Sequence, residues 1–70
     1  MSKSVVHVGR VESFDVHRGT GVVVDDGGDE YPFHCTAISD GTRDIEPGTR
    51  VSFEISAGLG RWEAITLAPA

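Results

Sequence analysis

The sequence predicts an all-β protein, a small five-stranded antiparallel barrel, on three observations. The chain of 70 residues contains nine glycines and three prolines, which mark frequent turns. β-Branched residues recur between these turns, and no convincing helical stripe accompanies them. Five short strands in so small a chain must cover their apolar faces by curling, and a closed or nearly closed barrel does this.

The strands are expected at residues 5–15, 20–24, 30–35, 49–56 and 61–68. The first is long enough that we expect a bend or bulge near Gly9. Glycines and aspartates at 25–29 predict a turn between the second and third strands, because they adopt positive φ and hydrogen-bond the local backbone. Residues 36–41 predict one turn of helix, followed by an irregular stretch that ends at Pro47 and Gly48.

Alternation within the last two strands predicts which side chains form the core. Val51, Phe53 and Ile55 occupy every second position of the fourth strand, which places them on one face. In the fifth strand we expect Ile65 and Leu67 to point inward.

Charge and cysteine content limit the classes of function. The net charge is −5, whereas a sequence-blind nucleic-acid binder is typically basic because phosphate neutralisation supplies most of its affinity. The single cysteine, Cys35, permits no intramolecular disulfide and favours the cytoplasm. Apolar runs are too short for a membrane helix. We therefore expect a soluble, cytoplasmic protein.

Enzymatic and metal-binding interpretations receive little support. No cluster of histidines and carboxylates repeats at metal-ligand spacing, and segment 25–30 lacks the ligand spacing of a calcium loop. His34 and Cys35 are neighbours on a predicted strand, so they should point to opposite faces and pair poorly. We expect no catalysis, no metal and no cofactor.

A family resemblance rests on segments that include GRVESFD at 9–15, RGTGVV at 18–23 and YPFHCTAI at 31–38. In this order they resemble the bacterial cold-shock proteins. GRVESFD at 9–15 is similar to the family's G-x-V-K-W-F-N, RGTGVV at 18–23 to K-G-F-G-F-I, and YPFHCTAI at 31–38 to V-F-V-H-F-S-A-I. Asp-Gly at 40–41 and GTRVSFE at 48–54 resemble the later D-G and G-x-x-V-x-F-x. The resemblance covers 9–67 and implies one cold-shock-like domain over 1–70, an OB-type barrel that binds single-stranded RNA or DNA.

The same alignment shows that most of the family's base-stacking rings are replaced. The positions concerned are Ser13, Thr20, Val22, Pro32, Cys35 and Thr42. Glu12 stands where the family has a lysine. Phe14 and His34 survive, and Arg18 is a conservative change. Tyr31 and Phe33 align with inward valines and are expected in the core.

The candidate nucleic-acid-binding residues are those that keep the family pattern, together with cationic and aromatic side chains that could lie beside them. They are Phe14, His34, Arg18, Arg10, His17, Arg61 and Trp62, with Arg43 as a further cation. Arginine can partly replace both a ring and a lysine because it stacks on bases and pairs with phosphate.

Structural alternatives stay open for three of these residues. Phe14 could cap the barrel end, His34 could be an ordinary exposed histidine, and Trp62 could cover the rim of the core. Two functions therefore follow from the sequence. The first is weak or altered binding of single-stranded nucleic acid, with a role in transcription or RNA metabolism. The second is an acidic adaptor that binds a protein partner through the same barrel.

Overall fold

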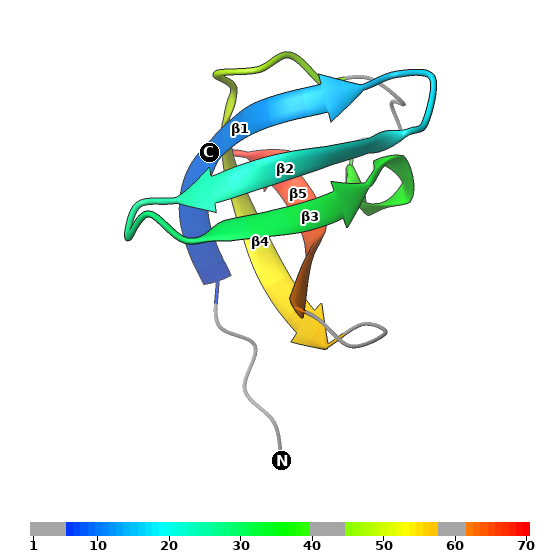
Figure 1. Cartoon of the computed structure of the whole chain (residues 1–70). Helices are drawn as coiled ribbons and strands as arrows, with labels where there is room; N and C mark the ends of the chain where they lie inside the picture. Colours follow the sequence, from blue (N-terminus) through cyan, green and yellow to red (C-terminus); the bar gives the residue numbers. More distant parts are fainter. Residues whose placement is uncertain (1–5, 40–44, 58–61) are drawn as a thin grey trace.

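The computed structural model describes residues 6–39, 45–57 and 62–70, and all statements below concern these residues. Five β-strands and one short 3-10 helix, η1, follow one another along the chain (Figure 1). Their bounds are β1 Val6–Asp15, β2 Thr20–Asp25, β3 Glu30–His34, η1 Cys35–Ala37, β4 Arg50–Ala57 and β5 Trp62–Pro69. The all-β prediction is confirmed, and no strand bound differs from the predicted one by more than one residue.

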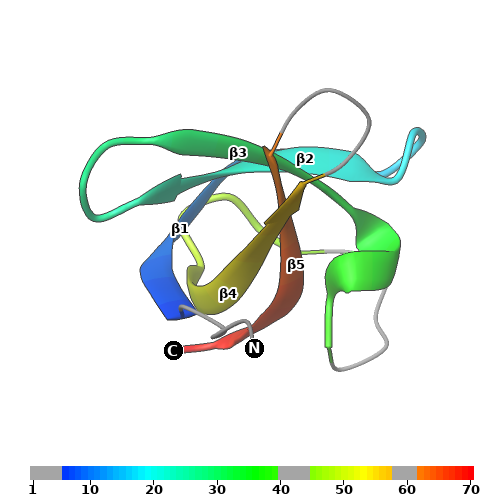
Figure 2. The ribbon, with the colours of Figure 1, turned by 90° about the horizontal axis from the view of Figure 1, so that it is seen from below.

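All five strands belong to one antiparallel sheet in the order β3-β2-β1-β4-β5. Strand β1 is shared between the two halves of the sheet, since residues 6–10 pair with β4 and residues 9–15 pair with β2. Figure 1 shows the bend of β1 that lets it do so. Figure 2, seen from below, shows the sheet curled around its interior. The predicted barrel is thus present as a curled sheet of the OB type.

The two edge strands approach each other without forming a ladder. After η1, Ile38 forms a single parallel bridge with Leu67, and the Ser39 N–H donates to the Leu67 carbonyl at 2.7 Å. This contact joins the end of β3 and η1 to β5, so the barrel is nearly closed on that side.

One apolar core fills the interior, and every strand contributes to it. Its buried members are Val11, Val23, Phe33, Ile38, Val51, Phe53, Ala64 and Leu67. The predicted inward alternation of β4 is confirmed, because Val51 and Phe53 are buried and Ile55 packs against the core. Phe33 is buried as expected, and Tyr31 is half-buried against the same cluster.

The predicted irregularity of β1 is present, but its expected position near Gly9 was wrong by three residues, since the bulge lies at Glu12. Gly9 pairs in regular register with both Asp25 and Val51. The register of β1 with β2 shifts between Val11 and Ser13, which marks a β-bulge. An extra residue is needed there because Val11 and Phe14 both pack inward although they are three positions apart.

The prediction that Ile65 points inward was also wrong, and a second bulge explains why. The β4–β5 register shifts between Ser52 and Glu54, and Thr66 has a positive φ of 54°. The interruption places Ala64 and Leu67 in the core, three positions apart, and leaves Ile65 on the outside opposite Glu54. The two-residue alternation of inward and outward side chains along β5 therefore does not continue across this bulge.

The predicted turn at 25–29 is confirmed and is organised by Asp25. Its Oδ1 accepts hydrogen bonds from the N–H groups of Gly27 and Asp29, both at 2.9 Å. The Asp25 N–H donates to the Asp29 carbonyl at the same distance. The turn connects β2 to β3 and leaves Asp26 exposed.

Candidate nucleic-acid interface

Cross-strand pairing defines a continuous outer face on β1, β2 and β3. Residues directly opposite one another in an antiparallel pair point to the same side of the sheet. The register therefore groups exposed and half-buried side chains into three rows, Asp15–Thr20–His34, Ser13–Val22–Pro32 and Arg10–Val24–Glu30. The predicted ring replacements at Ser13, Thr20, Val22 and Pro32 all fall on this outer face.

An open groove of about 770 Å³ lies over the first two rows and the adjoining end of the barrel. Its described lining includes Phe14, Arg18 and His34, so the structure brings together the three residues that survive from the family pattern. Pro32 and Val22 form an apolar floor beside them. The groove is thus a candidate binding site with few rings and a mixed charge.

Phe14 packs against the core and also lines the groove. Phe14, Gly21 and Phe33 form a row on the inner side of the sheet, and the two rings stack at 5.8 Å with an interplanar angle of 16°. Gly21 is required beneath them, because a Cβ there would lie 2.7 Å from the Phe33 ring. One face of the Phe14 ring is therefore occupied by Phe33, while part of the ring remains accessible in the groove.

His34 is exposed at the end of β3, and a hydrogen bond from the Thr36 N–H to its Nδ1 atom holds the ring in place. Its Nδ1 accepts a hydrogen bond from the Thr36 N–H at 3.3 Å and lies 3.0 Å from the Thr36 Oγ1. This arrangement makes His34 the N-cap of η1 and assigns the acceptor role to Nδ1. In the neutral ring Nε2 then carries the proton, and the exposed ring is oriented for contact with a ligand.

The prediction that His34 and Cys35 point apart was wrong. The Cys35 Sγ lies 3.8 Å from the His34 Nδ1. The argument from strand geometry fails because β3 ends at His34 and Cys35 begins η1, where neighbouring side chains do not alternate. Cys35 also packs against the core and lies close to Gly19, where a Cβ would meet the sulfur at 3.0 Å. The Gly19 φ of 67° suits the turn that carries Arg18.

Arg18 lies in the turn between β1 and β2, which Asp15 organises. The Asp15 Oδ1 accepts from the N–H groups of His17 and Arg18, at 2.9 and 3.2 Å. Its Oδ2 lies 4.0 Å from the Arg18 Nε, but the Arg18 side chain is 81% exposed, so this ion pair is weak. Arg18 is thus free to meet a phosphate at the edge of the groove. His17 is exposed in the same turn and is not among the described lining residues.

Arg10 occupies the third row of the outer face, beyond the groove. It stands opposite Val24 on β2 and opposite Arg50 on β4. Arg50 was not predicted as part of the site, and its guanidinium is held by Asp26, with N–O distances of 3.0 and 3.5 Å. Arg10 therefore extends the outer face as a second cation, separated from Arg18 by the apolar middle row.

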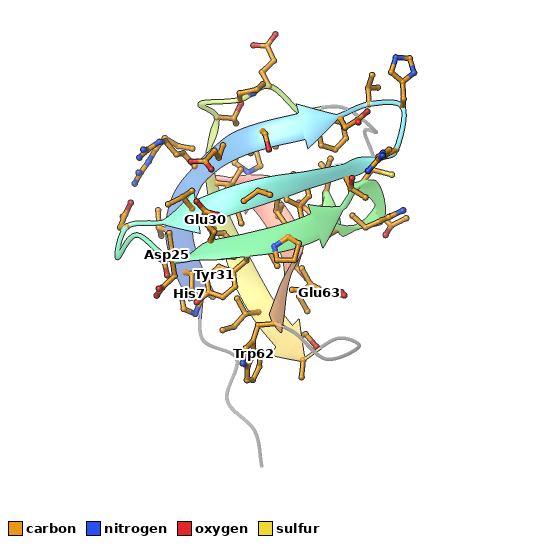
Figure 3. The ribbon with its side chains drawn as sticks, viewed as in Figure 1. His7, Asp25, Glu30, Tyr31, Trp62 and Glu63 are labelled. Atoms are coloured by element: carbon orange, nitrogen blue, oxygen red, sulfur yellow. The ribbon has the colours of Figure 1, made fainter. Side chains whose placement is uncertain are left out.

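Of the remaining candidate residues, Trp62 lies away from the groove and Arg61 lies outside the described residues. Trp62 begins β5, is 58% exposed, and is not among the described residues that line the groove or pack against the core. Figure 3 shows it below β3 rather than over the outer face. A rim-covering role is therefore not supported for Trp62. Arg61, Arg43 and Thr42 lie outside the described residues.

Glu63 and Asp15 line the groove although sequence reasoning predicted neither, and Glu63 comes from a strand distant in sequence. It lies on β5, is half-buried, and lines the groove opposite residues of β1, β2 and β3. No local sequence signal could have placed it there, because its position depends on β5 crossing the end of β3. Its carboxylate makes the groove less basic than the predicted residues alone suggested.

A second polar cluster lies near the other end of β3, around His7. The His7 ring stacks on Phe53 at 5.7 Å and tilts against Tyr31 at 6.0 Å, with its Nδ1 3.5 Å from the Asp25 Oδ2 (Figure 3). The Asp29 N–H, and then the Gly27 N–H and His7, hold the pKa of Asp25 below its ordinary value of 3.8, although burial opposes them. Burial, and then the charges of Asp29 and Asp25, raise the pKa of Tyr31. This cluster ties β1 to the turn after β2.

Neither a metal centre nor a membrane-spanning helix is found within the described ranges. Over 6–39, 45–57 and 62–70, no three His, Cys, Asp or Glu side chains gather so that they could hold a metal ion. In the same part of the chain no helix is long and apolar enough to cross a membrane.

The curled five-stranded sheet, with a groove over β1, β2 and β3, is the arrangement of an OB-type binding domain. Comparison with known families makes this specific, since the model of the 'Cold-shock' DNA-binding domain matches residues 7–69. The chain therefore belongs to the cold-shock domain family. It is 43% identical over 51 residues to cold shock protein CspD of Bacillus subtilis (strain 168), a match that spans 71% of this chain and 77% of that protein.

Proposed function

We propose that this protein is a non-enzymatic binder of single-stranded RNA or DNA that acts with weak or altered affinity in the cytoplasm, in transcription or RNA metabolism. The observation that carries the proposal is the groove in which His34, Phe14 and Arg18 meet. His34 offers an exposed ring for stacking, Arg18 offers a cation for phosphate, and Val22 and Pro32 offer an apolar floor. Membership of a family described as DNA-binding supports the same function.

The expected affinity follows from the groups that are absent from the outer face. Base stacking contributes about 1–3 kcal/mol per base, so the loss of about five stacking positions, at about 1 kcal/mol each and if additive, costs roughly 5 kcal/mol, or several thousandfold in affinity. Rings share bases, so the true cost is smaller. His34 remains as an exposed ring, whereas one face of Phe14 is covered by Phe33. We therefore expect dissociation constants in the high micromolar range.

Fluorescence anisotropy with end-labelled oligothymidylate and a mixed-sequence RNA at low ionic strength tests this proposal. Trp62 emission is a poor reporter because its ring lies outside the groove. The proposal expects saturable binding to at least one of the two oligonucleotides, weakened by added salt. The absence of any response at high micromolar protein would refute it.

A second candidate function, an acidic adaptor for a protein partner, is favoured by one observation. The outer face of β1, β4 and β5 carries exposed apolar side chains in two neighbouring rows. Val6 and Ile65 flank Glu54, and Val8 and Ala68 flank Ser52. Val6 is 62% exposed, although exposed apolar residues are common on small proteins. A nuclease-resistant, stoichiometric protein partner in a pull-down would favour this function, and recovery of RNA alone would count against it.

A further inference from the structure

Glu63 occupies a junction between two cavities. It lines the groove together with His34, and the same two residues line a second cleft of about 340 Å³ between η1 and β5. The remaining lining of this cleft is small and polar or short and apolar, namely Thr36, Ala37, Ser39, Ala64, Ile65 and Thr66. Figure 3 shows Glu63 projecting from β5 in a different direction from Trp62. His34 and Glu63 thus border the same two cavities, so a base that contacts His34 in the groove lies in a space that Glu63 also lines.

The two carboxylates among the described groove residues differ in their availability. Asp15 already accepts two backbone N–H groups through Oδ1, and its Oδ2 faces Arg18. Glu63 stands opposite Ser56 in the sheet, and within the described part of the chain its carboxylate accepts no hydrogen bond and forms no ion pair. Glu63 is thus the groove carboxylate that a ligand can use.

An ionised carboxylate accepts hydrogen bonds and donates none, and its two oxygens can receive a parallel pair of donors. Guanine presents such a pair on its Watson–Crick edge, with N1–H beside the N2 amino group. Cytosine and adenine present one amino group next to a ring nitrogen that accepts. Thymine and uracil present two carbonyl oxygens on either side of N3–H, and these oxygens would repel a carboxylate.

We propose that Glu63 is a specificity-determining residue that selects guanine at the base position beside His34. This inference rests on the proposed function, because it assigns a base preference to the same groove. The expected affinity is highest for guanine, lower for cytosine and adenine, and lowest for thymine or uracil. A good bidentate contact of this kind discriminates against the wrong base by about fivefold or more.

Fluorescence anisotropy gives the dissociation constants of heptathymidylate and of four variants in which the central nucleoside carries guanine, hypoxanthine (inosine), cytosine or adenine. The buffer contains lithium, which prevents guanine quadruplexes. Inosine keeps N1–H but lacks the N2 amino group, so it should lose most of the preference. The variant E63Q removes the acceptor pair. The matched control E54Q removes the same charge from a half-buried glutamate on β4, on the outer face of β1, β4 and β5 and away from the groove lining.

The inference expects the guanine oligomer to bind the wild-type protein and E54Q about fivefold or more tightly than the thymine and inosine oligomers. E63Q should bind all of them within about twofold of one another, with its fold verified by circular dichroism. If the oligomers bind wild-type protein with equal affinity, or if E63Q keeps the preference, this inference is wrong while the proposed function stands. If E63Q merely strengthens binding of every oligomer by the same factor, Glu63 repels phosphate and the inference is wrong. If no oligomer binds the wild-type protein, this inference is wrong, and the proposed function is then decided by the titration with mixed-sequence RNA.

Discussion

Substitution of Val22 by phenylalanine should restore part of the stacking surface that this chain lacks. Val22 lies at the centre of the outer face, between Ser13 on β1 and Pro32 on β3. Its side chain is half-buried and points away from the core, and both neighbours are small. A phenyl ring can therefore lie flat over the groove without displacing a buried residue.

The size of the expected gain comes from the value of a single stacking contact. One base on one ring contributes about 1–3 kcal/mol, which corresponds to a dissociation constant lower by about 5- to 150-fold. The new ring would lie one row from His34, so the two rings could share a base. We therefore expect the lower part of this range, about tenfold, for V22F.

Anisotropy titrations of wild-type protein and V22F with the same labelled oligothymidylate measure this gain. The control is V8F, which places the same ring on β1 but on the face formed with β4 and β5. V8F should leave the dissociation constant unchanged within about twofold, since a ring outside the groove has no base to stack on. Amide spectra of both variants verify that the barrel is intact.

Two outcomes would refute the reasoning. If V22F changes the affinity by less than twofold while remaining folded, the outer face of β1, β2 and β3 does not carry stacked bases. If V8F tightens binding as much as V22F does, the added ring acts through general hydrophobicity, and the location of the groove is irrelevant.

Three further predictions concern charge, acid stability and the core. R18Q should reduce the slope of log affinity against log salt by about 0.7, which is the value of one phosphate contact on a single strand. R50Q should leave this slope unchanged, because Arg50 is held by Asp26. Equal slopes for the wild-type protein and R18Q would show that Arg18 does not contact the nucleic acid. The folded-state pKa of Asp25 lies below its ordinary value of 3.8, so this carboxylate contributes stability that is present above that value and is lost as the pH falls through the folded-state pKa. Urea unfolding of D25N, which keeps the turn acceptor but does not titrate, should show a smaller loss of stability below pH 3.8 than wild type, and parallel curves would contradict the assignment. In the core, L67A should lower the free energy of unfolding by about 2–5 kcal/mol because Leu67 is 1% exposed. I65A should lower it by only about 0.5 kcal/mol, because Ile65 lies on the outside. Similar losses for both variants would contradict the second bulge.

Much of the fold could be predicted from local patterns, and the errors share one cause. Alternation in β4 identified Val51 and Phe53 correctly because that stretch points its side chains inward at every second position. Alternation failed at Ile65, since a bulge inserts one residue and reverses the faces beyond it. The inward pairs Val11 with Phe14 and Ala64 with Leu67 are each three residues apart, a spacing that indicates a bulge once the strands are known.

The site could be predicted only where the family pattern supplied the positions. Phe14, Arg18 and His34 were predicted from motifs and do meet in one groove. Glu63 was missed because it reaches the groove through a strand distant in sequence, and the contact of Cys35 with His34 was missed because β3 ends one residue earlier than predicted. Such placements depend on how separate strands are brought together, which local spacing does not specify.

NMR can locate, residue by residue, the binding of single-stranded nucleic acid that we propose for the outer face of β1, β2 and β3. Amide and histidine side-chain shifts are followed during titration with an oligonucleotide at low salt. We expect progressive shifts at Thr20, Val22 and His34, with little change at Val8, Ser52 and Ala68 on the outer face of β1, β4 and β5. Shifts confined to Val8, Ser52 and Ala68, or no shifts at high micromolar oligonucleotide, would contradict this proposal.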